Sequence, residues 1–227
     1  MKVIINNQEV DVSNFSGIEY IEISSSVTEI GNGAFRDCRS LKSVVIPNSV
    51  TKIGDEAFRD CRSLKSIAIP DSVTEIGDGA FRDCRSLKSI AIPNSVTKIG
   101  KGAFCACMHL KSISIPNSVI EIGDWAFCGC WHLEKSTTIP NSITEIGKGA
   151  FFGCMRLESI VIPDSVTEIR EAAFSYCVSL KSITIPDSVT EIGDYAFHNC
   201  ASLTRVAIPD SVKKIGIDAF DEGCKLI

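Results

Sequence analysis

The sequence predicts a solenoid, mostly β, in which one unit occurs nine times and the copies stack side by side. Two residue types mark the period. Proline recurs in steps of 23 residues with a single step of 24, at positions 47, 70, 93, 116, 140, 163, 186 and 209. Phenylalanine recurs in the same way, at positions 35, 58, 81, 104, 127, 151, 174, 197 and 220. Such a period indicates units that bury their apolar face only against their neighbours.

Residues 1–17 precede the first copy and lack the period. Their apolar run Val3–Ile5, the pair Asn6–Asn7 and the alternating segment 9–12 predict a short hairpin with an Asn-rich turn. We expect residues 1–17 to form a capping hairpin, because an open solenoid end exposes core. Residues 18–227 then form one continuous domain of nine copies, which begin at Ile18, Leu41, Leu64, Leu87, Leu110, Leu133, Leu157, Leu180 and Leu203.

With Leu41 as position 1, the unit reads Leu-x-x-Ile-x-Ile-Pro-x-Ser-Val-x-x-Ile-Gly-x-x-Ala-Phe-x-x-Cys-x-x. Positions 1 to 6 predict a strand with alternate side chains inward, which the proline at position 7 ends. The serine at position 9 is expected to bond backbone groups in the turn. Glycine at position 14 predicts a positive φ or a close backbone approach, and Arg170 is the one exception to it.

The single step of 24 residues places one extra residue within Glu134–Thr138, in the first strand of the sixth copy. An extra residue in a strand turns the following side chains to the opposite face unless a bulge absorbs it. We therefore expect a bulge there. We also expect Thr137 to occupy a core place that is aliphatic in the other copies.

Eleven cysteines invite a disulfide interpretation, but most of them follow the repeat. Nine are assigned to one repeat position, where free cysteine packs as a small apolar residue: Cys38, Cys61, Cys84, Cys107, Cys130, Cys154, Cys177, Cys200 and Cys224. Only Cys105 and Cys128 fall outside this row.

The bulk properties exclude several classes of function. A net charge of -5 and a pI near 5.3 argue against a nucleic-acid-binding protein, which needs a basic face. No apolar run approaches the length of a membrane span, so no membrane insertion is expected. The first residues do not read as a secretory signal, so we expect either that the chain as written is intracellular or that a signal was removed from it. Phosphate-binding loops and nucleophile elbows are missing from the sequence, so we predict no enzyme and no cofactor.

One copy carries the residues Leu64-x-x-Ile67-x-Ile69-Pro70-x-x-Val73-x-x-Ile76-Gly77-x-x-Ala80-Phe81-x-x-Cys84. This unit resembles the 23-residue leucine-rich repeat of the BspA-like (Treponema pallidum-type) family. The resemblance implies a leucine-rich-repeat solenoid, right-handed and curved, with a concave parallel sheet and little helix. It also implies a non-enzymatic binding scaffold, commonly displayed on bacterial or protist surfaces and used in adhesion.

Function is expected where the copies differ from one another. The first three copies share the turn Phe-Arg-Asp-Cys-Arg-Ser, and the later ones replace it with aromatic and sulfur-containing residues. Because stacked copies align, we expect a cluster along one edge that contacts a protein or glycan: Met108, His109, Trp125, Trp131, His132, Phe152, Met155, Tyr176 and Tyr195. The alternative is that these side chains fold over the neighbouring turn as local packing.

Four residues in adjacent copies have side chains that bind soft metals: Cys105, His109, Cys128 and His132. Tetrahedral zinc needs four such ligands, but the spacing matches no known zinc motif. Three alternatives therefore stay open for the cysteines, namely a metal site, a Cys105–Cys128 disulfide and free thiols.

Two functional hypotheses follow. The first is an interaction scaffold that binds a protein or glycan through the cluster of aromatic and sulfur-containing residues given above, with the concave sheet as a second surface. The second is a structural module that self-associates, because the last copy shows no cap and its open end could stack on another chain.

Overall fold

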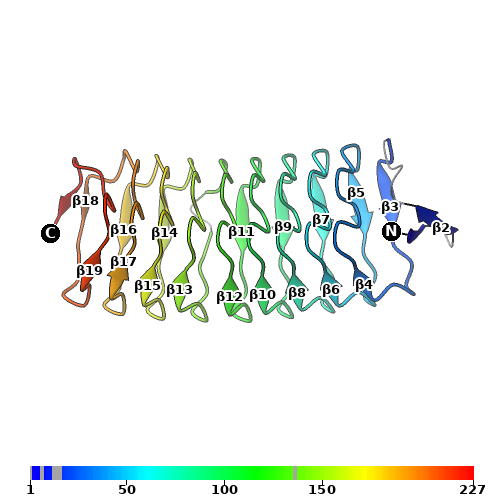
Figure 1. Cartoon of the computed structure of the whole chain (residues 1–227), viewed down its shortest axis with the longest axis horizontal. Helices are drawn as coiled ribbons and strands as arrows, with labels where there is room; N and C mark the ends of the chain where they lie inside the picture. Colours follow the sequence, from blue (N-terminus) through cyan, green and yellow to red (C-terminus); the bar gives the residue numbers. More distant parts are fainter. Residues whose placement is uncertain (1, 6–7, 12–16, 135–136) are drawn as a thin grey trace.

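The computed structural model describes residues 2–5, 8–11, 17–134 and 137–227. These residues form a parallel-stacked β-solenoid of about nine turns, and none of them lies in a helix. Figure 1 shows the turns following one another along the long axis, with the two ends of the chain at opposite ends of the stack. No described segment is a helix that is long and apolar enough to cross a membrane.

The N-terminal residues form the expected hairpin. Strands β1 (Lys2–Ile5) and β2 (Gln8–Asp11) pair antiparallel, with Lys2 opposite Asp11 and Ile5 opposite Gln8. The Asn6–Asn7 turn lies outside the described residues. That the hairpin caps the first copy stays a prediction.

Within the described residues, every turn of the solenoid except the sixth contributes two short strands, and the sixth contributes one. The first row consists of β3 (Tyr20–Glu22), β5 (Ser43–Val45), β7 (Ser66–Ala68), β9 (Ser89–Ala91), β11 (Ser112–Ser114), β14 (Ser159–Val161), β16 (Ser182–Thr184) and β18 (Arg205–Val206). The second row consists of β4 (Glu29–Ile30), β6 (Lys52–Ile53), β8 (Glu75–Ile76), β10 (Lys98–Ile99), β12 (Glu121–Ile122), β13 (Glu145–Ile146), β15 (Glu168–Ile169), β17 (Glu191–Ile192) and β19 (Lys214–Ile215). A last strand, β20 (Lys225–Leu226), pairs parallel with β18.

The core runs the length of the stack and is built from the repeated residues. Leucine at position 1, the isoleucines and valines of both strands, and alanine and phenylalanine at positions 17 and 18 are buried in the central copies. The phenylalanine rings of successive copies lie with centroids 5.0–5.6 Å apart and planes within 20° of parallel. Each buried ring therefore packs against the rings before and after it, and the copies stabilise one another.

In the second to eighth copies, two polar groups bond to the preceding copy, whereas the Ser211 hydroxyl of the ninth copy has no partner among the described residues. The position 9 hydroxyl donates to a carbonyl of the preceding copy over 2.5–2.7 Å, as Ser72 does to Val50, for example. The position 21 thiol donates to the carbonyl of the preceding phenylalanine over 3.1–3.4 Å, as Cys84 does to Phe58. The expectation for serine is confirmed, and the buried cysteine adds a weak hydrogen bond to its apolar packing.

Glycine at position 14 is required by close packing, and the alternative of a positive φ is wrong for it. A Cβ added at Gly100 would lie 2.5 Å from the carbonyl carbon of Gly77 in the copy before. Arg170 replaces this glycine in the seventh copy, and nothing in the structure explains how that copy accommodates it. A looser contact lies one copy earlier, where a Cβ on Gly147 would meet nothing of the fifth copy closer than 3.1 Å. The Arg170 guanidinium reaches Glu145 at 3.7 Å and Glu168 at 3.5 Å.

The extra residue of the sixth copy interrupts the strands. Residues 135–136 lie outside the described range, and with them the predicted bulge. Thr137 is 2% exposed in the core place expected for it, and its hydroxyl has no hydrogen-bond partner among the described residues. The second row divides here into a five-stranded sheet ending at β12 and a four-stranded sheet beginning at β13.

Cys224 does not belong to the row of core cysteines, contrary to the assignment made from the sequence. It follows Phe220 by four residues, whereas Cys200 follows Phe197 by three. Cys224 is consequently only partly buried, whereas Cys61 to Cys200 in the row are buried. The ninth copy also leaves Ile215, Ile217, Leu226 and Ile227 exposed.

Candidate functional site

The turn that follows the second strand contains two residues per copy in the left-handed region of φ. Position 16 has φ between 49° and 63° in all nine copies, and position 20 has φ between 57° and 69° in the first eight. Glycine tolerates this region freely, and aspartate and asparagine tolerate it better than other residues. Most copies carry one of these residues at position 20, and four carry glycine at position 16.

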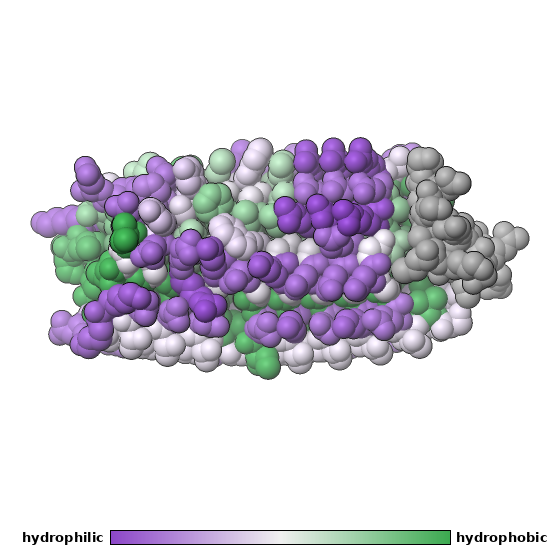
Figure 2. Space-filling view, in the orientation of Figure 1, coloured by the Kyte–Doolittle hydropathy of each residue, from purple (hydrophilic) through white to green (hydrophobic). Residues whose placement is uncertain are grey.

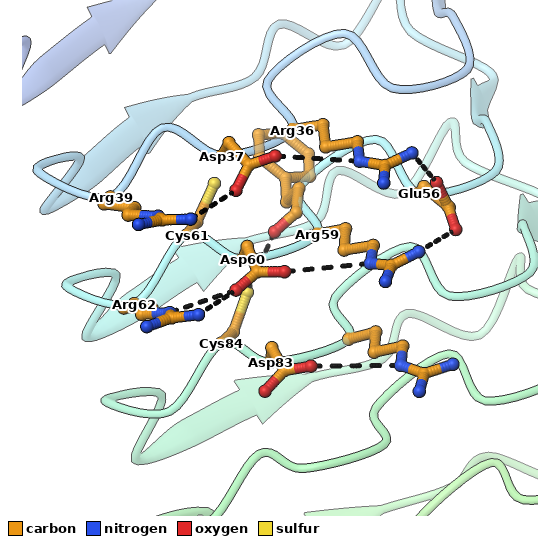
Figure 3. A network of polar contacts seen from close by, with 12 residues as sticks. Arg36, Asp37, Arg39, Glu56, Arg59, Asp60, Cys61, Arg62, Asp83 and Cys84 are labelled. Carbon is orange, nitrogen blue, oxygen red and sulfur yellow. Dashed lines mark hydrogen bonds and ion pairs between the residues drawn. The ribbon is translucent and has the colours of Figure 1, made fainter. Parts of the chain in front are cut away.

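In the first three copies this turn forms a charged network (Figure 3). Aspartates occupy position 20, and the Arg62 and Arg85 guanidiniums bind Asp60 and Asp83 at 2.8 and 2.9 Å. Glu56 binds Arg36 at 2.5 Å and also pairs with Arg59. Figure 2 shows hydrophilic side chains in rows over these N-terminal copies, with apolar groups among the polar ones toward the other end. The charged turn is the common form from which the later copies depart.

Three aromatic residues of the later copies occupy left-handed positions. Trp125 and Tyr195 stand at position 16 with φ of 61° and 58°, and Tyr176 stands at position 20 with φ of 61°. A bulky residue in this region is strained by about 1–2 kcal/mol relative to the ordinary helical or extended region. The fold therefore holds these three rings in place at a cost that glycine in the same positions avoids.

These rings form a continuous row across four copies. Trp125 packs edge-on against Phe152 with centroids 5.7 Å apart, and Phe152 packs against Tyr176 at 5.2 Å. His198 continues the row, 6.4 Å from Tyr176 and 5.7 Å from Tyr195. We call these five residues the aromatic edge. His198 was not among the residues singled out from the sequence, although its place at position 19 of the eighth copy is that of Phe152 in the sixth.

A second row of side chains stands at position 22 of successive copies, two residues after position 20. It contains Met108, which is partly buried, and three residues with exposed side chains, Trp131, Met155 and Val178. The indole nitrogen of Trp131 lies 3.9 Å from where a Cβ on Gly129 would be, so this row borders position 20 of the turn. Val178 was also missed from the sequence, because valine alone gave no signal.

The two remaining candidates, His109 and His132, face one another. Their rings stack with centroids 5.2 Å apart. Each Nδ1 lies 2.7 Å from a carbonyl oxygen of the preceding copy, Arg85 for His109 and Met108 for His132. Because a carbonyl can only accept, each Nδ1 carries a proton and is not free to bind a metal.

The four candidate metal ligands are not brought together. Among the described residues, no group of three or more histidine, cysteine, aspartate or glutamate side chains is placed to hold a metal ion. Cys105 and Cys128 do meet, and both are free thiols with partly exposed side chains. The structure therefore gives no support for zinc at Cys105, His109, Cys128 and His132, and the two cysteines form a pair of their own.

A cavity of about 490 Å³ opens over these thiols. It exists because Gly79 and Gly102 leave position 16 without a side chain in two successive copies, between Glu56 and Trp125. We call it the thiol cavity. Its wall also includes Asp55, Asp78, Arg82, Lys101, Cys105 and Cys128.

Comparison with known proteins identifies the family. The BspA type leucine rich repeat region matches residues 12–134 and 133–227, which together span nearly the whole chain. The chain belongs to this family. No curated protein is similar enough to the chain to support a closer assignment.

Solved structures of similar proteins confirm the solenoid. A leucine-rich repeat protein from Bacteroides ovatus is 29% identical, with a TM-score of 0.78 over 96% of this chain and 76% of that one. The Treponema pallidum leucine-rich repeat protein is 28% identical, with a TM-score of 0.57 over 90% and 76% of the two chains. The pneumococcal vaccine antigen PcpA shares the fold, with 20% identity and a TM-score of 0.62 over 95% and 66%.

Proposed function

We propose that this BspA-type repeat protein is a non-enzymatic scaffold that binds a protein partner through the aromatic edge and the neighbouring Trp131 and Met155. The observation that carries the proposal is the left-handed backbone at Trp125, Tyr176 and Tyr195. Strained residues gather at functional sites, because folding alone favours their replacement. Three bulky rings in such positions on one surface therefore support a role in recognition.

Exposure supports the same surface. The side chains of Trp131, Met155, Tyr176 and Tyr195 are 40–44% exposed, although each is large and apolar or aromatic. Tryptophan, tyrosine and methionine are enriched at protein interfaces, and an apolar cluster of this kind marks an interaction site more often than ordinary surface. The packing alternative accounts for the contacts of Trp125 with Phe152, but it does not account for this exposure.

The arrangement of the rings favours a protein over a glycan. A sugar stacks on a flat, exposed ring face, whereas here neighbouring rings are tilted by 63°, 48° and 77° against one another. Tilted rings alternating with methionine and valine give an uneven apolar surface, of the kind that packs against side chains. The surface spans the fifth to the eighth copies.

The test is capture of a partner with the wild-type chain and two double variants. Trp125→Gly/Trp131→Ser removes both tryptophans, and glycine suits the left-handed position at residue 125. Val45→Ser/Val161→Ser is the matched control, since both valines are exposed on the first row of strands. A partner that binds wild type and control but binds the tryptophan variant at least about 30-fold more weakly supports the proposal. Equal binding by all three proteins refutes the proposal. Capture of a glycan instead of a protein would show that the partner class is wrong.

One observation favours the alternative of self-association. The ninth copy exposes Ile215 and Ile217, and Ile215 stands at position 13, which is buried in most other copies. Stacking of this surface on a second chain predicts a mass that rises with concentration in light scattering. A constant monomer mass over the same range refutes self-association without affecting the aromatic edge.

A further inference from the structure

The backbone around Cys105 and Cys128 holds the two residues directly opposite one another. The amide of Phe104 donates to the carbonyl of Ala126 at 2.8 Å, and the amide of Ala106 donates to the carbonyl of Cys128 at 2.7 Å. Bonds on both sides of Cys105 fix the register of the fourth and fifth copies at this point. Neighbouring chains in such a ladder lie about 4.8 Å apart. That spacing is within the range of about 4.4–6.8 Å that a disulfide requires between Cα atoms.

These thiols differ from the core cysteines beside them. Cys107 and Cys130 are fully buried and donate to phenylalanine carbonyls, whereas Cys105 and Cys128 line the thiol cavity. Burial raises the pKa of Cys107 and Cys130 well above the ordinary range. Core thiols of this kind are inert, because the thiolate is the reactive form.

The charges around the cavity favour a thiolate on Cys105. The hydrogen bond from the Cys128 thiol, aided by the nearby Arg82 guanidinium, lowers the pKa of Cys105 to about 7, although burial and Asp83 oppose this. The same hydrogen bond raises the pKa of Cys128, so the second proton of the pair is held. Arg82 stands at position 19 of the third copy, one copy before Cys105 and two before Cys128, and it lines the same cavity. We therefore assign Cys105 as the attacking thiol and Cys128 as the resolving thiol.

We propose that Cys105 and Cys128 are a dithiol modification site, open through the thiol cavity, which exchanges with low-molecular-weight disulfides to form a disulfide between the fourth and fifth copies. The Cys105 thiolate attacks one sulfur of the small disulfide, whose S–S bond breaks and releases one small thiolate. The Cys128 sulfur then attacks Cys105 of the mixed disulfide, its proton passes to solvent, and the second small thiol leaves. Two protein thiols are oxidised by two electrons, and the small disulfide is reduced to two thiols.

The test uses glutathione disulfide on the folded full-length chain, followed by a count of free thiols after unfolding in acid. The wild-type count is expected to fall from eleven to nine, without a glutathione adduct. Mass spectrometry is expected to join the tryptic peptides 102–111 and 112–135 through Cys105 and Cys128, with loss of two hydrogen atoms. A count that stays at eleven, or a wild-type product that keeps glutathione, overturns the proposal.

Variants assign the two roles. Cys128→Ser is expected to stop at a glutathione adduct on Cys105, and Cys105→Ser is expected to react at least about ten times more slowly than wild type. Cys224→Ser is the matched control, since it removes a partly buried thiol outside the cavity and should leave the cross-link unchanged. Circular dichroism before the reaction shows that each variant is folded. A cross-link through Cys107 or Cys130, which requires opening of the core, overturns the assignment.

Discussion

Phe127 provides the most direct test of the stacked core. Its ring is fully buried in the fifth copy, with Phe104 at 5.6 Å on one side and Phe151 at 5.4 Å on the other. Removing the ring loses roughly 2–3 kcal/mol of burial and two stacked pairs of about 0.5–1.5 kcal/mol each. Phe127→Ala is therefore expected to lower the free energy of unfolding by about 3–5 kcal/mol.

Phe220→Ala is the matched control at the end of the stack. Phe220 is partly buried and has one described ring neighbour, Phe197 at 5.0 Å. The same change there loses one pair and less burial, so we expect a cost of about 1–2 kcal/mol. The contrast between the two variants separates stacking from a general effect of removing an aromatic ring.

The assay is urea unfolding followed by two signals. The only two tryptophans, Trp125 and Trp131, lie in the same copy as Phe127, so their fluorescence reports that copy. Far-ultraviolet circular dichroism reports the whole stack, and coincident transitions show that the copies unfold together. A loss below about 1 kcal/mol for Phe127→Ala, or equal losses for both variants, would contradict the stacked core.

Four further predictions concern single residues. Thr137→Val should raise the free energy of unfolding, measured in urea, by about 1 kcal/mol, because the buried hydroxyl has no partner among the described residues. A loss of stability would show that the hydroxyl has a partner. Ala172→Gly should raise it by about 0.5–1 kcal/mol, since Ala172 has φ of 55°, and a loss would refute the strain argument. Gly100→Ala should lower it by at least about 2 kcal/mol, because the new Cβ would overlap the preceding backbone; a neutral result would mean that the stack yields easily. The pKa of Cys105 is lowered to about 7, so its alkylation rate should reach half its maximum near pH 7. Arg82→Ala should move this midpoint to higher pH. A wild-type midpoint near 8.5, the ordinary pKa of a thiol, would remove the case for a thiolate.

The repeated part of the structure could be predicted from the sequence because residues at the same repeat position make the same contacts in successive copies. The repeated phenylalanine stacks on the phenylalanine of the neighbouring copy, and the repeated cysteine and serine donate hydrogen bonds to the preceding copy. A residue that recurs at one repeat position therefore indicates a contact between stacked copies. Gly100 and its equivalents were identified as special, but the physical reason was close packing, and the letter glycine does not distinguish that from a positive φ. Cys224 was misassigned because a cysteine one residue late looks like a member of the same column.

The left-handed positions were missed although a signal for them exists. Position 20 carries aspartate, glycine or asparagine in six of the first eight copies, residues that tolerate a positive φ. Ala106 and Tyr176 hid the pattern, as Trp125 and Tyr195 did at position 16. The aromatic residues were identified as candidates by their difference from the first copies. Their strain, their tilts and the contribution of His198 depend on backbone angles and neighbours that no single column of letters contains.

The interruption between β12 and β13 makes the fifth and sixth copies a joint in the molecule. On the strand side the second-row ladder is broken there, whereas on the turn side the amides of Trp125, Phe127 and Gly129 still bond to the sixth copy at 2.7–2.8 Å. The Phe127 and Phe151 rings are also tilted by 20°, against 2–5° for most pairs. The second row thus consists of two arrays, of five and four strands, which meet at this joint. Trp125 of the fifth copy packs across this joint against Phe152 of the sixth, so a molecule bound to both rings would contact both arrays at once.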